Sequence, residues 1–196
     1  MDVPTLESTR ILVRKLTDED LHAIHAVLCA AFGEPELAAD AAALAERARW
    51  LQWTVLAYEQ LARLHQPPYG ERAIVLKATG ELIGAVGYVP CLNQFGRAPT
   101  WQDRIPRDAN VPEFGMFWAI APEQQGHGYA TEAARLMVDY AFNELHLTRI
   151  VATTEYDNDA SMSVMRKLGM RIEKNQHGEP FWFQVVGVLE NPTQKS

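Results

Sequence analysis

Residues 124–133 read QQGHGYATEA, and this stretch decides the expected fold. It follows the apolar segment 113–120, which has the composition of a β-strand, and it leads into a segment at 129–145 whose apolar residues have helical spacing. Glycine weakens a helix and adds backbone freedom that folding must remove. Gly126 and Gly128, placed where a helix must begin, therefore indicate a use that offsets this cost.

A glycine-rich turn between a strand and a helix is suited to bind a phosphate or pyrophosphate. The first amides of a helix have no intrahelical partner, and the helix dipole adds positive potential at the same end. The spacing has no Walker lysine and is not GxGxxG, which disfavours the two common nucleotide-binding loops. Glu123 and Glu132 lie nearby in the sequence and oppose an anion, although neither side chain needs to point into the turn.

The other segments predict an α+β fold with a mixed sheet. We expect β-strands at residues 10–16, 73–77, 82–89, 113–120, 149–154, 170–174 and 181–190. A first helix is expected between Thr17, which offers an N-cap, and Gly33. A short helix is expected after Asp157 or Asn158, with Gly169 as its C-terminal glycine.

Three segments stand apart from this pattern. Residues 36–65 are rich in alanine and predict helix, with a break near 50–54. Residues 90–112 hold four prolines and predict a long loop, which is uncommon in a compact domain and often functional. The polar tail 191–196 is expected to be frayed.

Length and composition favour one domain over residues 1–196, because 196 residues with 47% hydrophobic content can form a full core. The net charge of −7 argues against nonspecific binding to nucleic acid or anionic membranes and suits a cationic acceptor only weakly. The chain has two cysteines, a polar start and no apolar run that could span a bilayer. These features predict a cytoplasmic location.

The turn also matches a family pattern. Gln125-x-x-Gly128-x-Ala130 resembles the (Q/R)-x-x-G-x-(G/A) coenzyme A loop of the GCN5-related N-acetyltransferases (GNAT). Residues 112–174 are similar to the ribosomal-protein-alanine acetyltransferase (RimJ/RimL-like) branch throughout. They carry E-x-G-x-x-W, P-x-x-Q-G-x-G-Y-A-T-E-A, L-x-R-I and N-x-x-S-x-x-V-x-x-K-L-G-(F/M). The resemblance is looser at the amino-terminal strand and hairpin, and it does not cover 36–65 or 90–112.

The resemblance implies a GNAT fold, with a mixed, mostly antiparallel sheet of six to seven strands flanked by helices. It also implies acetyl-CoA as co-substrate, with no metal. The backbone amides expected to hold the pyrophosphate are those of Gln125, Gly126, His127, Gly128, Tyr129, Ala130 and Thr131. The pantetheine arm would pair with the strand at Trp118, Ala119 and Ile120, and Asn158 would bond to the pantetheine or adenosine side.

Acetyl transfer needs a base for the amine and a proton donor for the departing thiolate. Glu113 is the candidate base, because related enzymes often use a Glu on this strand through water; the alternative is a solvated carboxylate at a strand end. Ser161, at the N-x-x-S position, is the candidate donor; the alternative is a first-turn Ser bonded to Asn158 or to backbone. Tyr129 and Tyr156 remain rival donors.

Other residues carry weaker hypotheses. His22 and His25 lack a third ligand at close spacing, so a surface pair is favoured over a metal site. Cys91 is interpreted as a buried free thiol more readily than as a nucleophile. Trp50 and Trp53 would wall an acceptor pocket or belong to the core or a dimer face.

The sequence therefore predicts an acetyl-CoA-dependent N-acetyltransferase acting on a small amine or a protein N-terminus. The alternative is a CoA-binding sensor or interaction module of the same fold that has no turnover. Segments 36–65 and 90–112 are expected to shape the acceptor site, and a homodimer is left open.

Overall fold

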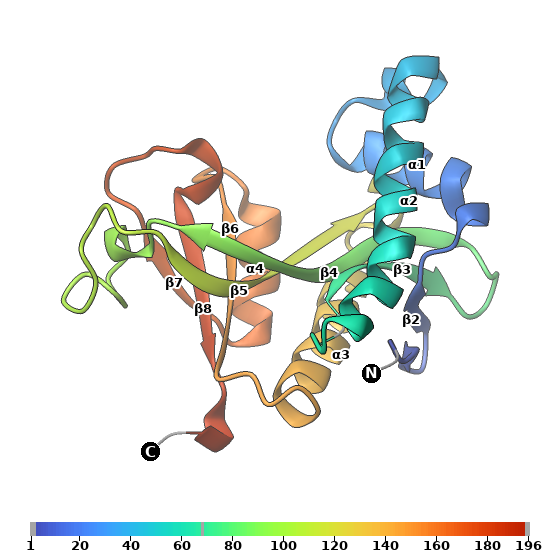
Figure 1. The fold of residues 1–196 in the computed structure, drawn as a ribbon. Coiled ribbons are helices and arrows are strands. Elements are labelled where there is room, and N and C mark those ends of the chain that lie inside the picture. The colour runs from blue at the N-terminus through green and yellow to red at the C-terminus, as the bar shows by residue number, and fades with distance from the viewer. Residues whose placement is uncertain (1–2, 68, 195–196) are drawn as a thin grey trace. The chain divides into compact units, whose positions relative to one another are not determined.

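The computed structural model describes residues 3–67 and 69–194. Its strands are β1 (Leu6–Glu7), β2 (Ile11–Lys15), β3 (Gly70–Leu76), β4 (Leu82–Asn93), β5 (Val111–Ile120), β6 (Arg149–Thr154), β7 (Arg171–Lys174) and β8 (Val185–Glu190). Its α-helices are α1 (Leu21–Ala31), α2 (Ala41–Arg63), α3 (Tyr129–Asn143) and α4 (Asp159–Leu168) (Figure 1).

The strands form one sheet in the order β1-β2-β3-β4-β5-β6-β8-β7. Neighbouring strands pair antiparallel at β1–β2, β2–β3, β3–β4, β6–β8 and β7–β8, whereas β5 pairs parallel with β6 at Gly115 and Val151. The predicted α+β class with a mixed, mostly antiparallel sheet is confirmed. The sheet of the described residues has eight strands rather than six to seven, because the two-residue β1 is too short to give an alternating pattern.

The chain divides into two compact units, which are described separately. Unit 1 comprises the described residues up to 88 together with 117–139, and unit 2 comprises 89–116 and the described residues from 140 onward. The strands β4 and β5 and the helix α3 each contribute residues to both units.

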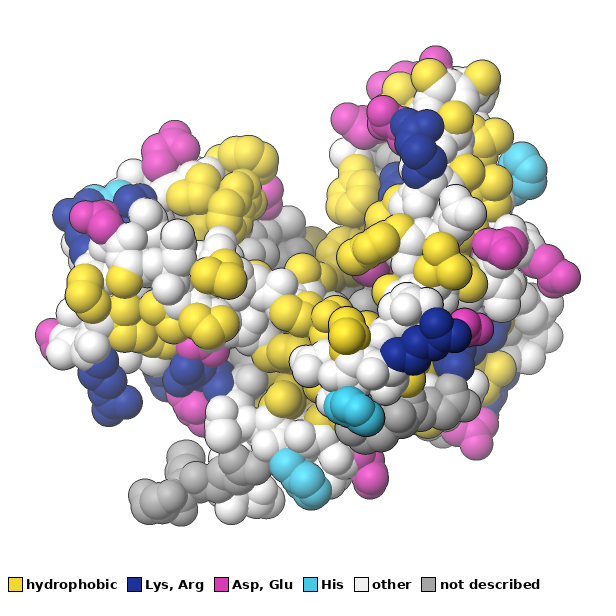
Figure 2. Space-filling model, in the orientation of Figure 1, with side chains coloured by type: hydrophobic (Ala, Val, Ile, Leu, Met, Phe, Trp, Pro, Cys, Tyr) yellow, Lys and Arg dark blue, Asp and Glu magenta, His cyan; other side chains and the backbone are white. Residues whose placement is uncertain are grey.

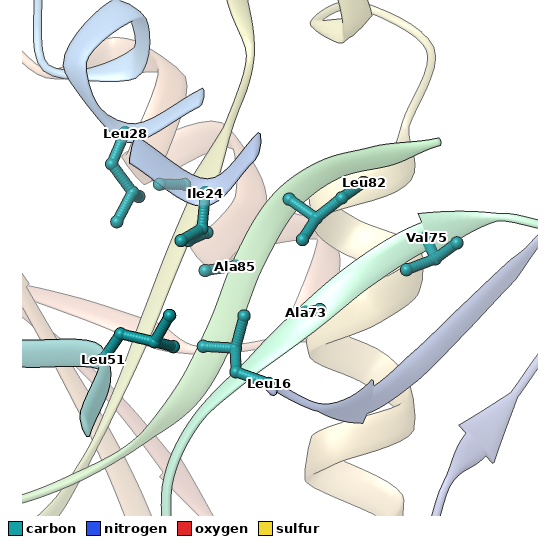
Figure 3. Close-up of a cluster of buried hydrophobic side chains, with 9 residues drawn as sticks. Leu16, Ile24, Leu28, Leu51, Ala73, Val75, Leu82 and Ala85 are labelled. Carbon is teal, nitrogen blue, oxygen red and sulfur yellow. The ribbon is translucent and has the colours of Figure 1, made fainter. Parts of the chain in front are cut away.

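The core of unit 1 lies where α1 and α2 pack against one face of the sheet. Its buried members, most of which Figure 3 labels, are Leu16, Ile24, Leu28, Leu51, Ala73, Val75, Leu82, Ala85 and Ala119. Burying a leucine or isoleucine side chain of this kind contributes about 1.5–3 kcal/mol relative to leaving it exposed. The aliphatic side chains of α1 and α2 therefore fix both helices on the sheet.

Helix α2 runs without interruption, so the predicted break near 50–54 is wrong. Residues 41–63 contain neither glycine nor proline, and Leu51 and Thr54 are both buried on the inner face of the continuous helix. The Asp40 side chain caps its start by accepting a hydrogen bond of 2.7 Å from the Ala43 amide. Hydrophobic packing and propensity together keep the helix intact through its aromatic middle.

Tyr58 on α2 connects the residue after β2 to the start of β3 through hydrogen bonds. Its buried hydroxyl accepts a hydrogen bond from the Leu16 amide (3.1 Å) and donates one to the Glu71 carbonyl (2.5 Å). Burial raises the pKa of Tyr58 to about 12, so the hydroxyl stays protonated at neutral pH and can donate.

We expect Tyr58→Phe to destabilise the protein by about 1–3 kcal/mol, because a buried amide of Leu16 and a carbonyl of Glu71 lose their partner. In a chain of this length each kcal/mol lowers Tm by roughly 2–4 °C. Thermal and urea unfolding measure the effect, and a Tm equal to that of the wild type would contradict the bridging role.

The core of unit 2 includes part of the segment predicted as a long loop. Phe95, Ala98 and Trp101 are buried against β6, β8 and Phe183, with ring centroids of Phe95 and Trp101 5.0 Å apart. The backbone amide and hydroxyl of Thr100 donate to the buried Glu173 carboxylate at 2.9 and 2.6 Å. Deleting this segment would therefore remove part of the hydrophobic core and destabilise unit 2. A change in the acceptor KM of such a deletion would not by itself show that the segment binds the acceptor.

Two further predictions concern unit 2: the glycine that ends α4, and the carboxyl-terminal tail. Gly169 follows α4 with φ of 86°, in the left-handed conformation expected of a C-terminal glycine. The prediction of a frayed tail from residue 191 is wrong for its first residue. Asn191 is buried, and its side-chain amide donates to the carbonyls of Leu147 (2.9 Å) and Phe142 (3.4 Å). Residues 195–196 lie outside the described part of the chain.

Candidate functional site

The glycine-rich turn joins β5 to α3 in unit 1 and has the geometry that the sequence predicts. Gly126 and Gly128 have φ of 78° and 84°, and α3 begins at Tyr129. A Cβ placed on Gly126 would meet no atom within 4 Å, and one on Gly128 would meet only the Arg10 guanidinium at 3.7 Å. Backbone conformation, not crowding, therefore requires glycine here, and the missing side chains leave room for a ligand against the start of the helix.

The turn is braced from within by Gln125 and His127. The Gln125 amide donates to the Pro122 carbonyl at 3.2 Å, and its side-chain amide donates to the Ile120 carbonyl at 3.0 Å. The His127 ring nitrogen Nδ1 lies 3.3 Å from the Gln124 carbonyl. Both N–H-bearing groups of Gln125 thus hold the turn in shape. The amides available to a ligand are those of Gly126 and the residues after it.

A cation that is distant in the sequence holds the same turn: Arg10, in the bend between β1 and β2. The Arg10 guanidinium donates to the His127 carbonyl at 3.1 Å and to Glu132 Oε2 at 2.8 Å, and it lies 4.7 Å from the centroid of the Tyr129 ring. Ser8 donates a short hydrogen bond to the other oxygen of Glu132. Sequence inspection missed Arg10, because the two partners are 122 residues apart.

The contact with Arg10 explains how the Glu132 carboxylate can lie close to a site for an anion. Burial opposes ionisation of Glu132, but hydrogen bonds from Ser8 and Arg10 outweigh it and lower its pKa below the ordinary value. The carboxylate is therefore charged and neutralised by Arg10. Both of its oxygens accept hydrogen bonds from Ser8 and Arg10, in the segment between β1 and β2, so neither is left unpaired beside the turn.

We expect Arg10→Ala to raise the KM for acetyl-CoA about five- to tenfold with a small change in kcat, because it frees the turn and leaves Glu132 unpaired. Adding Glu132→Gln to that variant should recover part of the loss. Lys77→Ala is the control, since it breaks another ion pair of unit 1, with Glu7 at 2.8 Å. Steady-state thiol release measures all four proteins, and equal acetyl-CoA KM values for Arg10→Ala and Lys77→Ala would refute the role.

One edge of the strand before the turn faces β4. The Ala121 amide donates to the Ile83 carbonyl of β4 at 2.9 Å, and the Ala119 carbonyl is closest to Gly84 of the same strand. Backbone N–H and C=O groups of successive residues point to opposite edges of a strand. Those of Trp118 and Ile120 therefore point away from β4, and those of Ala119 point toward it.

Asn158 and Ser161 belong to unit 2, at the start of α4. The Asn158 side chain accepts a hydrogen bond of 2.9 Å from the Ser161 amide and caps the helix. This is the local capping contact that the sequence left as the alternative for Ser161. It occupies the Ser161 amide and the Asn158 side-chain oxygen, and it does not involve the Ser161 hydroxyl or the Asn158 side-chain nitrogen.

Glu113, at the head of β5 in unit 2, sits in an ionic network. Its side chain is 5% exposed. Arg149 Nε donates to its Oε2 at 2.9 Å, a second Arg149 nitrogen donates to its Oε1, and Trp101 Nε1 donates to Oε1 at 2.9 Å. Glu190 lies 3.6 Å from Arg149 Nη1. Glu190 and Glu113 outweigh burial and raise the pKa of Arg149 above its ordinary value. Arg149 thus lies between two carboxylates, Glu113 and Glu190, and the Trp101 indole donates a further hydrogen bond to Glu113.

Glu113 and Ser161 are not neighbours along the unit 2 sheet. Glu113 contacts Arg149, the first residue of β6, whereas Ser161 lies on the helix that follows the last residue of β6. The structure brings Trp118 through Thr131 together in unit 1 and joins Asn158 to Ser161 in unit 2.

The remaining candidates have other roles. Cys91 is a free thiol that is half-buried rather than buried. Burial, followed by the charge of Glu113, raises the pKa of Cys91 to about 11, which disfavours a nucleophilic thiolate. His25 is buried, with Nε2 3.1 Å from the Leu37 carbonyl, so the expected surface pair is wrong for this residue. The Tyr156 hydroxyl donates to the Asn175 carbonyl.

In the part of the chain that the structure describes, no helix combines the length and the hydrophobicity that a bilayer-spanning segment needs. No group of three or more His, Cys, Asp or Glu side chains there is arranged to hold a metal ion.

The sequence matches known proteins over most of its length. Residues 10–171 match the acetyltransferase (GNAT) domain. The chain is 28% identical to the uncharacterised N-acetyltransferase YoaA of Bacillus subtilis, over 95% of this chain and 97% of that protein. It is 31% identical to the spermidine N(1)-acetyltransferase of Escherichia coli (strain K12), over 63% of this chain and 60% of that enzyme.

Solved structures share the fold. The ribosomal-protein-S5-alanine acetyltransferase of Vibrio fischeri superposes with a TM-score of 0.68 at 20% identity, covering 99% of this chain and 100% of that one. A GNAT-family acetyltransferase from Bacillus anthracis gives a TM-score of 0.67 at 21% identity, covering 96% and 99%. With a domain match that spans both units and an open glycine turn at the start of α3, the chain belongs to the GNAT family of acetyl-CoA-dependent acetyltransferases.

Proposed function

We propose that the protein transfers the acetyl group of acetyl-CoA to a primary amine by direct attack in a ternary complex. The observation that carries this proposal is the turn at Gly126–Thr131, open at both glycines and fastened by Arg10. Its geometry suits two linked phosphates, because amides at a helix start can converge on them.

Each part of unit 1 has a role in this proposal. The amides of Gly126, His127, Gly128, Tyr129, Ala130 and Thr131 would hold the pyrophosphate. Gln125 would shape the turn through its bonds to Pro122 and Ile120, and the outward edge of β5 at Trp118 and Ile120 would pair with the pantetheine amides. Ala119 would support that edge through its contact with β4. A bond from Asn158 to the carrier is carried over from the family pattern and stays a prediction.

The proposed chemistry needs no covalent enzyme intermediate. The amine nitrogen forms a bond to the thioester carbonyl carbon, the carbon–sulfur bond breaks, the amine loses a proton and the thiolate gains one. Backbone amides of the strand would stabilise the developing oxyanion. A base is needed because a lysine-type amine has a pKa of about 10.4 and an α-amino group one near 8.

The roles of Glu113 as base and Ser161 as proton donor stay predictions. The contacts around Glu113 support a second role, since both of its oxygens already accept hydrogen bonds from Arg149 and Trp101. A carboxylate held in this way anchors the head of β5. In a catalytic role it would act on the amine through water rather than by direct contact.

The acceptor class follows from charge and from named relatives. The net charge of −7 gives only weak support for a cationic amine. Relatives are named for acetylation of spermidine and of ribosomal-protein alanine. We propose a polyamine or a peptide α-amine as the acceptor and the cytoplasm as the location.

Two measurements test the function. Calorimetry with CoA tests the turn, and thiol release from acetyl-CoA in the presence of spermidine, or of a peptide with an N-terminal alanine, tests turnover. Binding with amine-dependent thiol release supports the proposal. Binding without release over a broad amine panel would instead establish a CoA-binding module. No binding of CoA at millimolar concentration, or displacement of CoA by ATP, would overturn the assignment of the turn.

A further inference from the structure

Helix α2 presents a full-length outer face that the unit 1 core does not use. Its inner face contributes Leu51, Thr54, Tyr58 and Leu61 to the buried residues. The opposite face carries Ala42, Glu46, Arg49, Trp53, Leu56, Gln60 and Arg63, all of them exposed. Trp53 is 62% and Leu56 is 51% exposed. Figure 2, in the orientation of Figure 1, shows exposed hydrophobic side chains in the region of α2. We call these seven residues the α2 seam.

The seam is one stripe of the helix, and three of its seven members, Ala42, Trp53 and Leu56, are apolar. Its members follow one another at intervals that alternate between four and three residues, the pattern that keeps one stripe facing a partner helix. The apolar pair Trp53 and Leu56 lies in the middle, where side chains three apart are neighbours. Glu46 lies toward one end, where Arg49 of the same helix is 3.8 Å from it, and a second basic residue, Arg63, lies at the other end. A large exposed tryptophan at the centre of such a stripe is typical of an interface anchor.

The order of charges selects the occupant. When two copies of the helix pair antiparallel about a two-fold axis level with Thr54 and Val55, Trp53 faces Leu56 of the second copy. In the same register Glu46 faces Arg63 and Arg49 faces Gln60, and the two-fold symmetry repeats each pair.

Other arrangements lose this complementarity. A shift by one heptad places Glu46 against Leu56 in one direction and Arg63 against Trp53 in the other. Parallel pairing sets Glu46, Arg49 and Arg63 each against the same residue of the partner, which brings like charges together. We propose that the α2 seam is the homodimer interface of this protein, an antiparallel pair of α2 helices from two copies.

A charge-swap series on the full chain tests this register. Sedimentation equilibrium should find the wild type to be a dimer. Glu46→Arg sets arginine against Arg63 at both ends, and Arg63→Glu sets glutamate against Glu46; each should raise the dimer dissociation constant about tenfold. The double variant restores opposite charges and should return to within about threefold of the wild type.

Two further variants complete the test. Trp53→Glu removes the central anchor and should yield monomer, with circular dichroism showing an intact fold. Glu81→Arg makes the same change of net charge as Glu46→Arg, but on an exposed turn of unit 1, and should leave the dimer unchanged. A monomeric wild type at about 100 µM, a dimer that survives Trp53→Glu, or a double variant no better than its parents would overturn the proposal.

Discussion

Arg149→Ala is expected to destabilise the protein by about 3–5 kcal/mol, because it leaves the buried Glu113 carboxylate without its counter-charge. Trp101 would remain as a donor to one oxygen only. The guanidinium also lies 4.9 Å from the centroid of the Trp101 ring, so the change removes packing as well as charge. Urea unfolding should show a lower midpoint, and Tm should fall on the order of 10 °C.

A matched control comes from a second carboxylate in unit 2. Glu173 is 6% exposed and pairs with Arg171, but the arginine there is 56% exposed and two hydrogen bonds from Thr100 remain when it is removed. Arg171→Ala should therefore cost clearly less than Arg149→Ala. Adding Glu113→Gln to Arg149→Ala should recover part of the loss, because the buried charge is gone. Equal costs for the two arginines, or no recovery in the double variant, would show that Glu113 is not held as a buried charge.

The same Glu113→Gln change separates an anchor from a base. If Glu113 only anchors β5, Glu113→Gln lowers the unfolding midpoint and does not change the shape of the pH profile of kcat/KM. If Glu113 is the base, the same substitution removes the limb of that profile that reports proton removal from the amine. Because the first readout is stability and the second is a profile, one variant can show either role or both.

Local signals explain what could be predicted from the sequence. The turn at Gly126 and Gly128, the helix behind it and the left-handed Gly169 are each specified by neighbours along the chain, and all three occur as expected. Glycine at a positive φ is a local requirement, so a short stretch of sequence is enough to find it.

Contacts between distant segments explain what was missed. Nothing near Arg10 in the sequence indicates that it pairs with Glu132. The prolines at 90–112 suggest a loop, yet Phe95 and Trp101 are buried in the core of unit 2. Pro90 is even tolerated within β4, since the pairing of β4 with β3 ends at Tyr88. Burial of aromatic side chains outweighed the local preference for turns, and only the tertiary structure shows where they pack.

Gly128→Ala is expected to raise the KM for acetyl-CoA at least tenfold, a loss of about 1.4 kcal/mol of binding. Two effects combine. A left-handed backbone costs a residue with a Cβ about 1–2 kcal/mol, so the turn at φ of 84° is pushed away from its shape. The added methyl group also enters the open space above the first amides of α3, where the proposal places the pyrophosphate.

Gly80→Ala separates these effects, because Gly80 also has positive φ, at 73°, and a Cβ there would meet no atom within 4 Å. It lies in the turn between β3 and β4, outside the proposed site. Both variants should lose similar stability in thermal unfolding, and only Gly128→Ala should weaken CoA binding in calorimetry. The acceptor KM should change little, since the substitution acts on the carrier and not on the amine. If the two glycine variants bind CoA equally well, the turn does not hold the phosphates, and the binding site must lie elsewhere on the chain.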